Sequence, residues 1–265
     1  MSDIRVLVAG VCGRMGRIVA QTINENQDML LVGGVDTAFA GADLGEECLG
    51  HRSGLAIEGE LPSAIARTKP TVMVDFTAPS AVLNNLRIAL TAGVHCVVGT
   101  TGLSPQDLDV VSALCAKHET SAIIAPNFSV GAVLMMRFAQ EAASRYDYAQ
   151  IYEMHHPGKK DAPSGTAMLT AKRIAEGKRG DMKSPQPEHE NLADSIGGQH
   201  AGIGVHAARM DGVVADQFVL FGGPGETLRI EHRTTGRECF MPGVVLCVRN
   251  IMNQKGLVVG LENLL

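Results

Sequence analysis

The first 145 residues alternate between short apolar runs, typical of buried strands, and longer segments with helical spacing. Four of the runs lead through glycine or proline into a helical pattern, whereas residues 37–70, after the remaining run, are too mixed to predict individual elements. The strand-like runs are residues 4–9, 30–36, 71–76, 94–98 and 121–125. Because parallel strands need long crossover connections, this order predicts an α/β fold with a Rossmann-like, doubly wound parallel sheet.

The pattern changes after residue 145. A strand is predicted at 148–155, a helix at 164–176 closed by Gly177, and a long polar loop at 178–200. Three more strands are predicted at 203–210, 216–221 and 227–232, the last two joined by a glycine-rich hairpin turn at 222–225. Apolar residues alternate with charged ones in the last strand, so one face of this sheet should be packed and the other polar.

The closing stretch contains an apolar helical pattern at 243–252 and a short strand-like run at 256–259. Its apolar character suggests that it returns to the parallel sheet. We therefore expect a discontinuous first domain formed by residues 1–127 and 237–265. Residues 128–236 should form a second α+β domain with an open mixed sheet.

A glycine-rich turn follows the first strand, with the sequence Gly10-Val11-Cys12-Gly13-Arg14-Met15-Gly16. Glycines at such a turn let the backbone approach a pyrophosphate, and the N–H groups of the next helix point at it. A plain strand-to-helix connection is the alternative. The buried strand before the turn and the helix after it favour dinucleotide binding.

Asp36 stands at the end of the second strand, 20 residues after Gly16, where a carboxylate is expected to bind the adenosine ribose hydroxyls. The alternative is a loop aspartate that bonds its own backbone. A carboxylate there repels the 2′-phosphate of NADPH, and Thr37 does not offset the charge, so NADH is the predicted preferred cofactor. Arg14 or Arg17 is close enough in sequence to leave NADPH use possible.

Small polar loops follow three of the other strands, at residues 76–78, 99–102 and 125–128. Each of them alone is explained equally well by turn chemistry. Ligands of doubly wound sheets collect at the carboxyl ends of the strands, so together these loops predict a site for the nicotinamide half of the dinucleotide.

The segment 153–167 brings together His155, His156, Lys159, Lys160 and a Ser-Gly-Thr helix start. Imidazole and amine groups can exchange protons, and the N–H groups of a new helix can hold an anion. The segment suits a small acidic substrate that gains or loses protons. Capping of the helix is the structural alternative, and spacing alone does not choose between the two lysines. Adjacent histidines of a strand point apart, so no metal site is predicted.

The net charge of −5, with no basic block, argues against nucleic acid or an anionic membrane as a partner. Neither a signal peptide nor a membrane span is predicted, and six cysteines without a Cys-x-x-Cys pair favour reduced thiols in the cytoplasm. Cys12 lies beside a helix N-terminus, where thiolates are favoured, so its alkylation should block the cofactor site. The alternative is that Cys12 is a small residue packed under the turn.

Five motifs resemble those of the dihydrodipicolinate reductase family, and the similarity runs nearly from end to end. The motifs are Gly-x-x-Gly-Arg-Met-Gly at 10–16, Val-Asp-Phe-Thr at 74–77, Gly-Thr-Thr-Gly at 99–102, Asn-Phe-Ser-x-Gly at 127–131 and Glu-x-His-His-x-x-Lys-x-Asp-x-Pro-Ser-Gly-Thr-Ala at 153–167. The resemblance implies that the first domain binds a dinucleotide and that the second binds substrate and forms a homotetramer. It also implies reduction of 4-hydroxy-tetrahydrodipicolinate with NAD(P)H in lysine and diaminopimelate biosynthesis.

The resemblance also implies residue roles. His155 is the expected proton donor or acceptor and Lys159 a proton donor, while His156, Gly165 and Thr166 contact the dicarboxylate substrate. The residues expected to bind the nucleotide are Gly10, Val11, Cys12, Gly13, Arg14, Met15, Asp36, Gly99, Thr100, Thr101, Ala125, Pro126, Asn127 and Phe128. Family members often have arginine where this chain has Thr37, which again puts NADPH use in doubt.

Two other functions remain open from the sequence. One is an NAD(P)-dependent reductase or dehydrogenase of another amino-acid-derived substrate, such as a semialdehyde, against which the His-His-x-x-Lys segment argues. The other is a module that senses nucleotide without turnover.

Overall fold

The computed structural model describes residues 4–192 and 195–265. The chain divides into two compact units, Met1–Ser129 with Phe240–Leu265, and Val130–Cys239. The described residues do not include positions 1–3, at the start of the segment for which no signal peptide is predicted, or positions 193 and 194 of the expected loop. Cofactor binding by the first unit and substrate binding by the second remain predictions.

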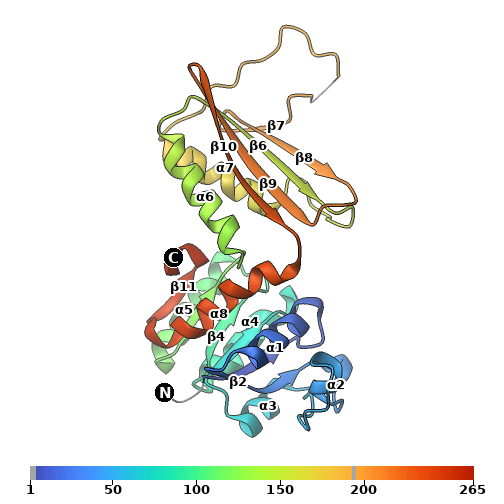
Figure 1. Cartoon of the computed structure of the whole chain (residues 1–265). Helices are drawn as coiled ribbons and strands as arrows, with labels where there is room; N and C mark the ends of the chain where they lie inside the picture. Colours follow the sequence, from blue (N-terminus) through green and yellow to red (C-terminus); the bar gives the residue numbers. More distant parts are fainter. Residues whose placement is uncertain (1–3, 193–194) are drawn as a thin grey trace. The chain divides into compact units, whose positions relative to one another are not determined.

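The first unit is built on a six-stranded sheet in the order β11-β5-β4-β3-β1-β2, in which every neighbouring pair is parallel (Figure 1). The strands are β1 (Ile4–Ala9), β2 (Met29–Val35), β3 (Val72–Asp75), β4 (His95–Val98), β5 (Ser121–Ile124) and β11 (Gly256–Val259). The predicted parallel sheet is confirmed. The strand order reverses between β1 and β3, and in such sheets this switch point is where ligands bind.

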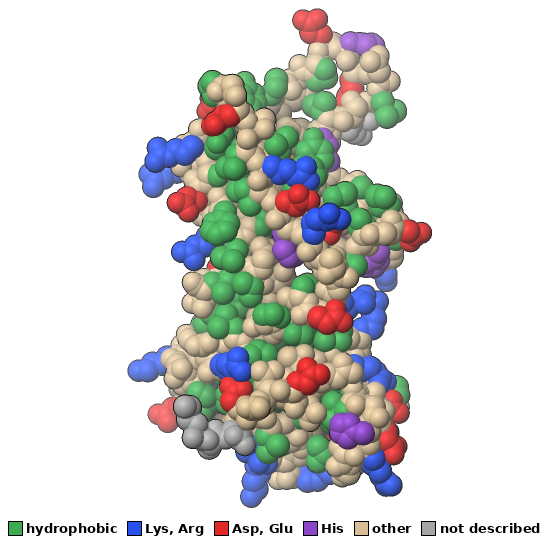
Figure 2. Space-filling view, in the orientation of Figure 1, with side chains coloured by type: hydrophobic (Ala, Val, Ile, Leu, Met, Phe, Trp, Pro, Cys, Tyr) green, Lys and Arg blue, Asp and Glu red, His purple; other side chains and the backbone are tan. Residues whose placement is uncertain are grey.

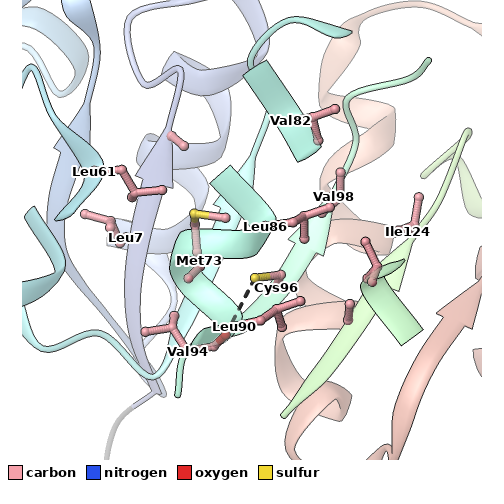
Figure 3. Close-up of a cluster of buried hydrophobic side chains, with 14 of the residues drawn as sticks. Leu7, Leu61, Met73, Val82, Leu86, Leu90, Val94, Cys96, Val98 and Ile124 are labelled. Carbon is pink, nitrogen blue, oxygen red and sulfur yellow. Dashed lines mark hydrogen bonds between the residues drawn. The ribbon is translucent and has the colours of Figure 1, made fainter. Parts of the chain in front are cut away.

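Helices cover both faces of this sheet. They are α1 (Arg14–Glu25), α2 (Leu44–Cys48), α3 (Leu61–Thr68), α4 (Pro79–Thr91), α5 (Pro105–His118) and α8 (Met241–Asn250). On one face, side chains of α3, α4 and α5 meet those of the strands in a single core that includes Leu61, Leu86 and Met73 (Figure 3). Helix α1 packs beside α8, and both bury apolar side chains. The return of the closing stretch to this sheet is therefore confirmed.

Local sequence explains where several of these helices begin. Pro79 and Pro105 occupy the first position of α4 and α5, where proline loses no helical hydrogen bond. Ser104 caps α5 and exchanges hydrogen bonds with Asp107 in a capping box. The segment 37–70, which the sequence left open, forms the turn η1 (Thr37–Phe39), α2 and α3.

The second unit has a five-stranded sheet in the order β10-β9-β6-β8-β7. The elements are α6 (Val130–Ala143), β6 (Tyr148–His155), α7 (Gly165–Lys178), β7 (Gly198–His200), β8 (Ile203–Arg209), β9 (Ala215–Gly223) and β10 (Glu226–Thr234). The sheet is mixed, as predicted, because β6 and β8 run parallel and the other pairs antiparallel. Helices α6 and α7 pack on one face, over a core that includes Ile151 and Phe221 (Figure 1). Short 3₁₀ turns follow at η2 (Arg237–Phe240), η3 (Ile251–Asn253) and η4 (Leu261–Leu264).

The prediction of one packed and one polar face is confirmed for β10. Leu228 and Ile230 pack against the core of the second unit. Arg229 and Glu231, on the other face, form an ion pair of 3.0 Å. Arg229 also lies over the ring of Phe218 on β9, with 3.8 Å from its guanidinium carbon to the ring centroid.

Gly177 does not close α7, so this expectation is wrong. The helix continues through Gly177 to Lys178, and Arg179 adopts the left-handed conformation that ends it. A Cβ at Gly177 would lie 2.0 Å from the carbonyl oxygen of Gln140 on α6. Glycine is needed there because it lets the two helices approach closely. The strand β7, within the expected loop, was also not predicted, since its three residues are exposed and carry no apolar alternation.

Among the described residues, no helix has both the length and the apolar character that a membrane crossing requires. On the face seen in Figure 2, acidic and basic side chains are scattered among one another over both units.

Candidate functional site

The glycine-rich turn lies at the switch point of the parallel sheet, between β1 and α1. Gly10 has a φ of +74°, and a Cβ there would lie 2.6 Å from the carbonyl oxygen of Phe76. A Cβ at Gly16 would lie 2.0 Å from the carbonyl oxygen of Gly10. Gly13 is the N-cap residue of α1 and provides no side-chain cap. The turn is therefore closely packed at its base and presents the uncapped start of a helix, which fits the pyrophosphate of a dinucleotide.

Asp36 bridges the end of β2 to this turn. One carboxylate oxygen accepts a hydrogen bond from the backbone N–H of Cys12 at 3.2 Å, and the other from the N–H of Ala38 at 3.1 Å. The bond to Ala38 is the local loop contact that formed the structural alternative. The bond to Cys12 places the carboxylate against the glycine turn, and each oxygen keeps a lone pair with which to accept a ribose hydroxyl.

Arg17 lies beside the same turn, and its guanidinium is held by several groups. Its Nη2 donates to the Glu47 carboxylate at 3.1 Å and its Nε to the carbonyl oxygen of Cys12 at 2.9 Å. The guanidinium also lies 5.5 Å from the ring centroid of Phe39. The hydrogen bond that Arg17 donates to Glu47 is the main reason that the pKa of Arg17 is raised. Arg14, in contrast, is exposed.

The Cys12 thiol does not have the character expected at a helix N-terminus. Burial raises its pKa to about 12, and the neighbouring Cys48 and Asp36 act in the same direction. The thiol is therefore protonated near neutral pH and is a poor target for alkylation. Cys12 is better described as a small packed residue, and the expectation of a favoured thiolate is wrong.

The three loops that follow β3, β4 and β5 are brought together. A Cβ at Gly99 would lie 2.1 Å from the ring of Phe76, so these two loops are in direct contact. The rings of Phe76 and Phe128 lie 5.7 Å apart between centroids. Ala125 and Phe128 are buried, while Thr101 is exposed. Asn127 accepts a hydrogen bond from the N–H of Ser129 at 2.8 Å, which shapes the third loop.

A buried carboxylate fixes two of these loops to each other. Asp75, at the end of β3, has no exposed surface. Its oxygens accept hydrogen bonds from the Thr77 N–H at 3.0 Å, the Thr77 hydroxyl at 2.7 Å, the Thr100 hydroxyl at 2.7 Å and the Asn85 amide at 2.8 Å. Thr100 thus acts at least in part by holding its loop in place.

In the second unit, β6 ends with Glu153 and His155 on the same side of the strand. The side chain of Glu153 is completely buried, and that of His155 is 13% exposed. His155 Nδ1 lies 2.6 Å from one oxygen of Glu153. Arg209, on the neighbouring strand β8, donates to both oxygens at 2.8 and 2.9 Å. Burial by itself raises the pKa of Glu153, but the hydrogen bonds from Arg209, His155 and the Ser164 N–H outweigh it and keep the pKa below its usual value.

Lys159 forms an ion pair with Asp161 in the loop between β6 and α7. This contact is the main reason that the pKa of Asp161 is lowered. Lys160 is exposed, whereas Lys159 is partly buried, so the structure distinguishes the two lysines that spacing did not. The imidazole of His156 lies over the turn at Gly158, where a Cβ would be 3.2 Å from its Nδ1.

Helix α7 begins next to this carboxylate. Ser164 caps the helix through a hydrogen bond from the Ala167 N–H at 3.2 Å, and its own N–H donates to Glu153 at 3.0 Å. Gly165 is exposed, and a Cβ there would meet nothing within 4 Å. Thr166 follows, half-buried. The helix start is therefore capped by Ser164, and it also faces open space at Gly165, where an anion can approach.

Two family models together match almost the whole chain. The model described as dihydrodipicolinate reductase, N-terminus, matches residues 4–128, and the model described as dihydrodipicolinate reductase, C-terminus, matches residues 131–265. The chain belongs to the dihydrodipicolinate reductase family. This is a family of NAD(P)H-dependent oxidoreductases, which agrees with the Rossmann-like sheet of the first unit.

Proteins of this family from several bacteria resemble the chain over its full length. A 4-hydroxy-tetrahydrodipicolinate reductase of Moorella thermoacetica is 44% identical, with 100% of this chain and 99% of that protein covered. One from Desulfitobacterium hafniense is 45% identical, with both chains fully covered. A dipicolinate-bound dihydrodipicolinate reductase structure from Paenisporosarcina sp. TG-14 is 38% identical and superposes with a TM-score of 0.88, covering 99% of this chain and 100% of that one.

Several residues of this dihydrodipicolinate reductase site were missed by the sequence reasoning. Glu153 could have been found, because it precedes His155 by two positions in a predicted strand and so shares its face. Arg209 could not, because it depends on the parallel pairing of β6 with β8. Asp75 appeared only as part of a motif, and its contacts with Thr100 cross between strand ends 25 residues apart. In the part of the chain that the structure describes, no group of three or more His, Cys, Asp or Glu residues is arranged to hold a metal.

Proposed function

We propose that this chain reduces 4-hydroxy-tetrahydrodipicolinate to tetrahydrodipicolinate with a reduced nicotinamide cofactor, as a step of lysine and diaminopimelate biosynthesis. Full-length relatives that carry this activity in their names support the substrate, and a relative bound to dipicolinate supports a ring dicarboxylate. The observation that carries the proposal is the connected group of His155, Glu153, Arg209, Asp161 and Lys159 next to the open start of α7.

The reaction adds a hydride and a proton to the ring and releases the hydroxyl group as water. Reduced nicotinamide, when bound, supplies the hydride. The protein has to hold the ring, offset the charge of its carboxylates and provide the proton. We assign the proton transfer to His155, as donor or acceptor, and to Lys159, as donor.

One substrate carboxylate is proposed to bind at the start of α7. The backbone N–H groups of Gly165 and Thr166 lie at the positive end of this helix, and the absence of a side chain at Gly165 leaves room for the anion. The Thr166 hydroxyl and His156 would add further donors. The Ser164 cap uses the N–H of Ala167 and not that of Gly165, which interacts with the Asp161 carboxylate and helps to lower its pKa. A substrate carboxylate would take the place of Asp161 at this N–H.

The nucleotide is proposed to bind at the switch point of the parallel sheet. The turn from Gly10 to Met15 would hold the pyrophosphate and Asp36 the adenosine ribose. The loops at 99–101 and 125–128 would face the nicotinamide half. The close approach of Gly10 to Phe76 and of Gly99 to Phe76 supports a single site, because it joins the loops after β1, β3 and β4.

We further propose that NADH is preferred over NADPH. Asp36 lies against the glycine turn, and its negative charge would repel a 2′-phosphate. Arg17, beside the same turn, is already paired with Glu47, and Thr37 adds no positive charge. Arg14 is exposed and remains available, so NADPH use is expected to be weaker and not absent.

A coupled assay tests the reaction. Aspartate semialdehyde and pyruvate are combined with a purified synthase, and the loss of reduced-nicotinamide absorbance is followed after this protein is added. Substrate-dependent oxidation of NADH, faster than that of NADPH, is expected. NADH binding without any turnover of the ring dicarboxylate would contradict the proposed reaction, and a faster reaction with NADPH would contradict the cofactor preference.

The chain is also proposed to act as a cytoplasmic homotetramer. The face of the second sheet opposite α6 and α7 carries three stacked rings, with centroids 4.4 Å apart for Tyr152 and His206 and 4.7 Å for Tyr152 and Phe218. An aromatic surface of this kind suits contact with a second copy of the same sheet. Sedimentation equilibrium should give four times the 28.0 kDa chain mass, and Tyr152→Glu should lower it.

A further inference from the structure

The strongest unassigned feature is the buried carboxylate behind His155. Glu153 and His155 lie two positions apart on β6, and the Glu153 side chain is completely buried while that of His155 is 13% exposed. The short contact of 2.6 Å joins a Glu153 oxygen to Nδ1 of the imidazole. Glu153 therefore holds the imidazole through Nδ1, and Nε2 is the ring nitrogen left for other contacts.

The other hydrogen bonds of Glu153 show which group carries the proton. Its carboxylate accepts from both Nη atoms of Arg209, at 2.9 and 2.8 Å, and from the N–H of Ser164 at 3.0 Å. Donors of this kind stabilise the ionised carboxylate. An ionised carboxylate can only accept, so the proton in the contact with His155 belongs to Nδ1.

We propose that Glu153 is the positioning residue of His155, and that it holds the proton on Nδ1 so that Nε2 is the atom that exchanges a proton with the bound ring. This inference rests on the proposed function, in which His155 transfers a proton. Neutral His155 then accepts at Nε2, and charged His155 donates from it, with the ring plane fixed in both forms. Carboxylates that orient an imidazole in this way are common in acid–base sites.

Arg209 completes the arrangement. Besides the two bonds to Glu153, its Nη1 donates to the carbonyl oxygen of Ala208 and its Nη2 to that of Asp161, both at 2.7 Å. All four Nη hydrogens are used within the protein, so Arg209 clamps Glu153, while its Nε is buried without a hydrogen-bond partner. Because Asp161 also pairs with Lys159, one guanidinium sets the position of both proposed proton-transfer groups.

The rival explanation is that Glu153 only stabilises the fold as the partner of a buried arginine. Substitution would then lower stability, and the protonation pattern of His155 would be of no consequence. The two explanations differ in what they predict for the imidazole of the unaltered protein, which can be measured without any variant at the carboxylate.

The first test is the ¹⁵N NMR spectrum of the protein labelled at its histidine ring nitrogens, recorded with and without NADH. The His155 signals are identified by their loss in His155→Gln. A protonated Nδ1 and an unprotonated Nε2 in the neutral ring are expected. A neutral ring with its proton on Nε2 would overturn the inference, whether or not the protein shows the proposed activity.

The second test is the steady-state kinetics of Glu153→Gln. The amide keeps the shape of the carboxylate but can donate to Nδ1, which favours the wrong tautomer. We expect kcat to fall about 10²-fold or more, while the affinity for NADH and the substrate KM change by less than about threefold. Asp216→Asn is the matched control, because it neutralises a buried carboxylate of the same sheet that contacts Thr234 and Arg233 and not His155. It should retain most of the parent kcat.

The outcomes separate this inference from the proposed function. A Glu153→Gln protein with parent kcat would overturn the positioning role, as would an equal loss in Asp216→Asn. If the unaltered protein does not turn over the ring dicarboxylate, the proposed function fails, and the NMR result still reports the tautomer. If Glu153→Gln does not fold, the spectrum of the unaltered protein decides.

Discussion

Asp75 in the first unit and Glu153 in the second are both buried carboxylates near the carboxyl end of a strand, yet their partners differ in kind. Asp75 accepts only from neutral groups, namely the hydroxyls of Thr77 and Thr100, a backbone N–H and the amide of Asn85. Glu153 accepts from a guanidinium, an imidazole and a backbone N–H. Neutral donors fix the geometry of loops, whereas an ion pair with an imidazole also controls where a proton resides.

The comparison predicts two kinds of defect that can be separated by experiment. Substitutions around Asp75 should weaken nucleotide binding and stability, because that network only shapes the loops after β3 and β4. Substitutions around Glu153 should slow the chemical step or weaken substrate binding, and they should leave nucleotide binding nearly unchanged. A variant that produced the opposite defect would break the comparison.

The largest effect is expected from the two proposed proton-transfer groups. His155→Gln and Lys159→Ala should each lower kcat by about 10²–10⁴-fold, because each removes a group that moves a proton in the transition state. The affinity for NADH, measured by fluorescence titration, should stay close to that of the parent.

Lys160→Ala is the matched control for Lys159→Ala, because Lys160 is the exposed neighbour with the same charge. It should turn over at nearly the parent rate. Equal losses in both lysine variants would point to a general charge effect, and undiminished turnover in either His155→Gln or Lys159→Ala would remove that residue from the mechanism.

The next largest effect concerns Asp75. Asp75→Asn places an N–H₂ group where only acceptors fit, next to the donors of Thr77, Thr100 and Asn85. A buried group without its partner costs about 1–3 kcal/mol, so the free energy of unfolding in urea should fall by about that amount. The Kd for NADH should rise because the loops after β3 and β4 lose their link, whereas kcat at saturating NADH should remain near the parent value.

Asp107→Asn serves as the control for Asp75→Asn. Asp107 belongs to the same unit, but it contacts Ser104 at the start of α5 and none of the groups that surround Asp75. It should cost some stability and leave the Kd for NADH unchanged. If Asp75→Asn lowers kcat at saturating NADH as strongly as Glu153→Gln, the distinction between the two networks is wrong.

A smaller effect is expected at the start of α7. Gly165→Val has space for its side chain within the protein, since a Cβ at Gly165 meets nothing within 4 Å, so the fold should tolerate it. The side chain would occupy the room proposed for the substrate carboxylate. Loss of hydrogen bonds to a charged group should raise the substrate KM about tenfold or more.

Gly180→Val provides a control in the same unit, because its Cβ also meets nothing within 4 Å and Gly180 lies beyond the far end of α7. Its KM should match that of the parent. An unchanged KM in Gly165→Val would remove this contact from the proposed binding site.

Much of the fold was predictable because its signals are local. Buried parallel strands are short apolar runs, and residues such as Pro79 and Ser104 mark helix starts within a few positions. The elements that were missed lack such a signal. The strand β7 is exposed throughout. In the sequence Gly177 resembles a helix stop, but in the structure it allows close packing of α7 against Gln140.

The residues of the candidate site also divide into those that the sequence could predict and those that it could not. Its motif residues were predictable because they stand together in the chain, as His155 and Lys159 do. Their supports were not, because they come from distant strands: Arg209 lies 56 residues from Glu153, and its role depends on which strands are neighbours in the sheet. The high pKa of Cys12 likewise depends on its burial and on Cys48, which folding brings beside it.

The smallest expected effect tests the cofactor preference within the first unit. Arg17 and Glu47 are each about one-third exposed, so their ion pair is only partly shielded from water. Glu47→Gln keeps the length of the side chain and removes its charge, which frees the positive charge of Arg17 to attract a 2′-phosphate. The ratio of kcat/KM for NADPH to that for NADH should rise about two- to fivefold, the range that an exposed ion pair supplies.

Glu46→Gln is the matched control, because it makes the same charge change beside Arg52 and does not contact Arg17. An equal rise in both variants would mean that net charge sets the preference, and no rise in Glu47→Gln would mean that Arg17 does not reach the nucleotide.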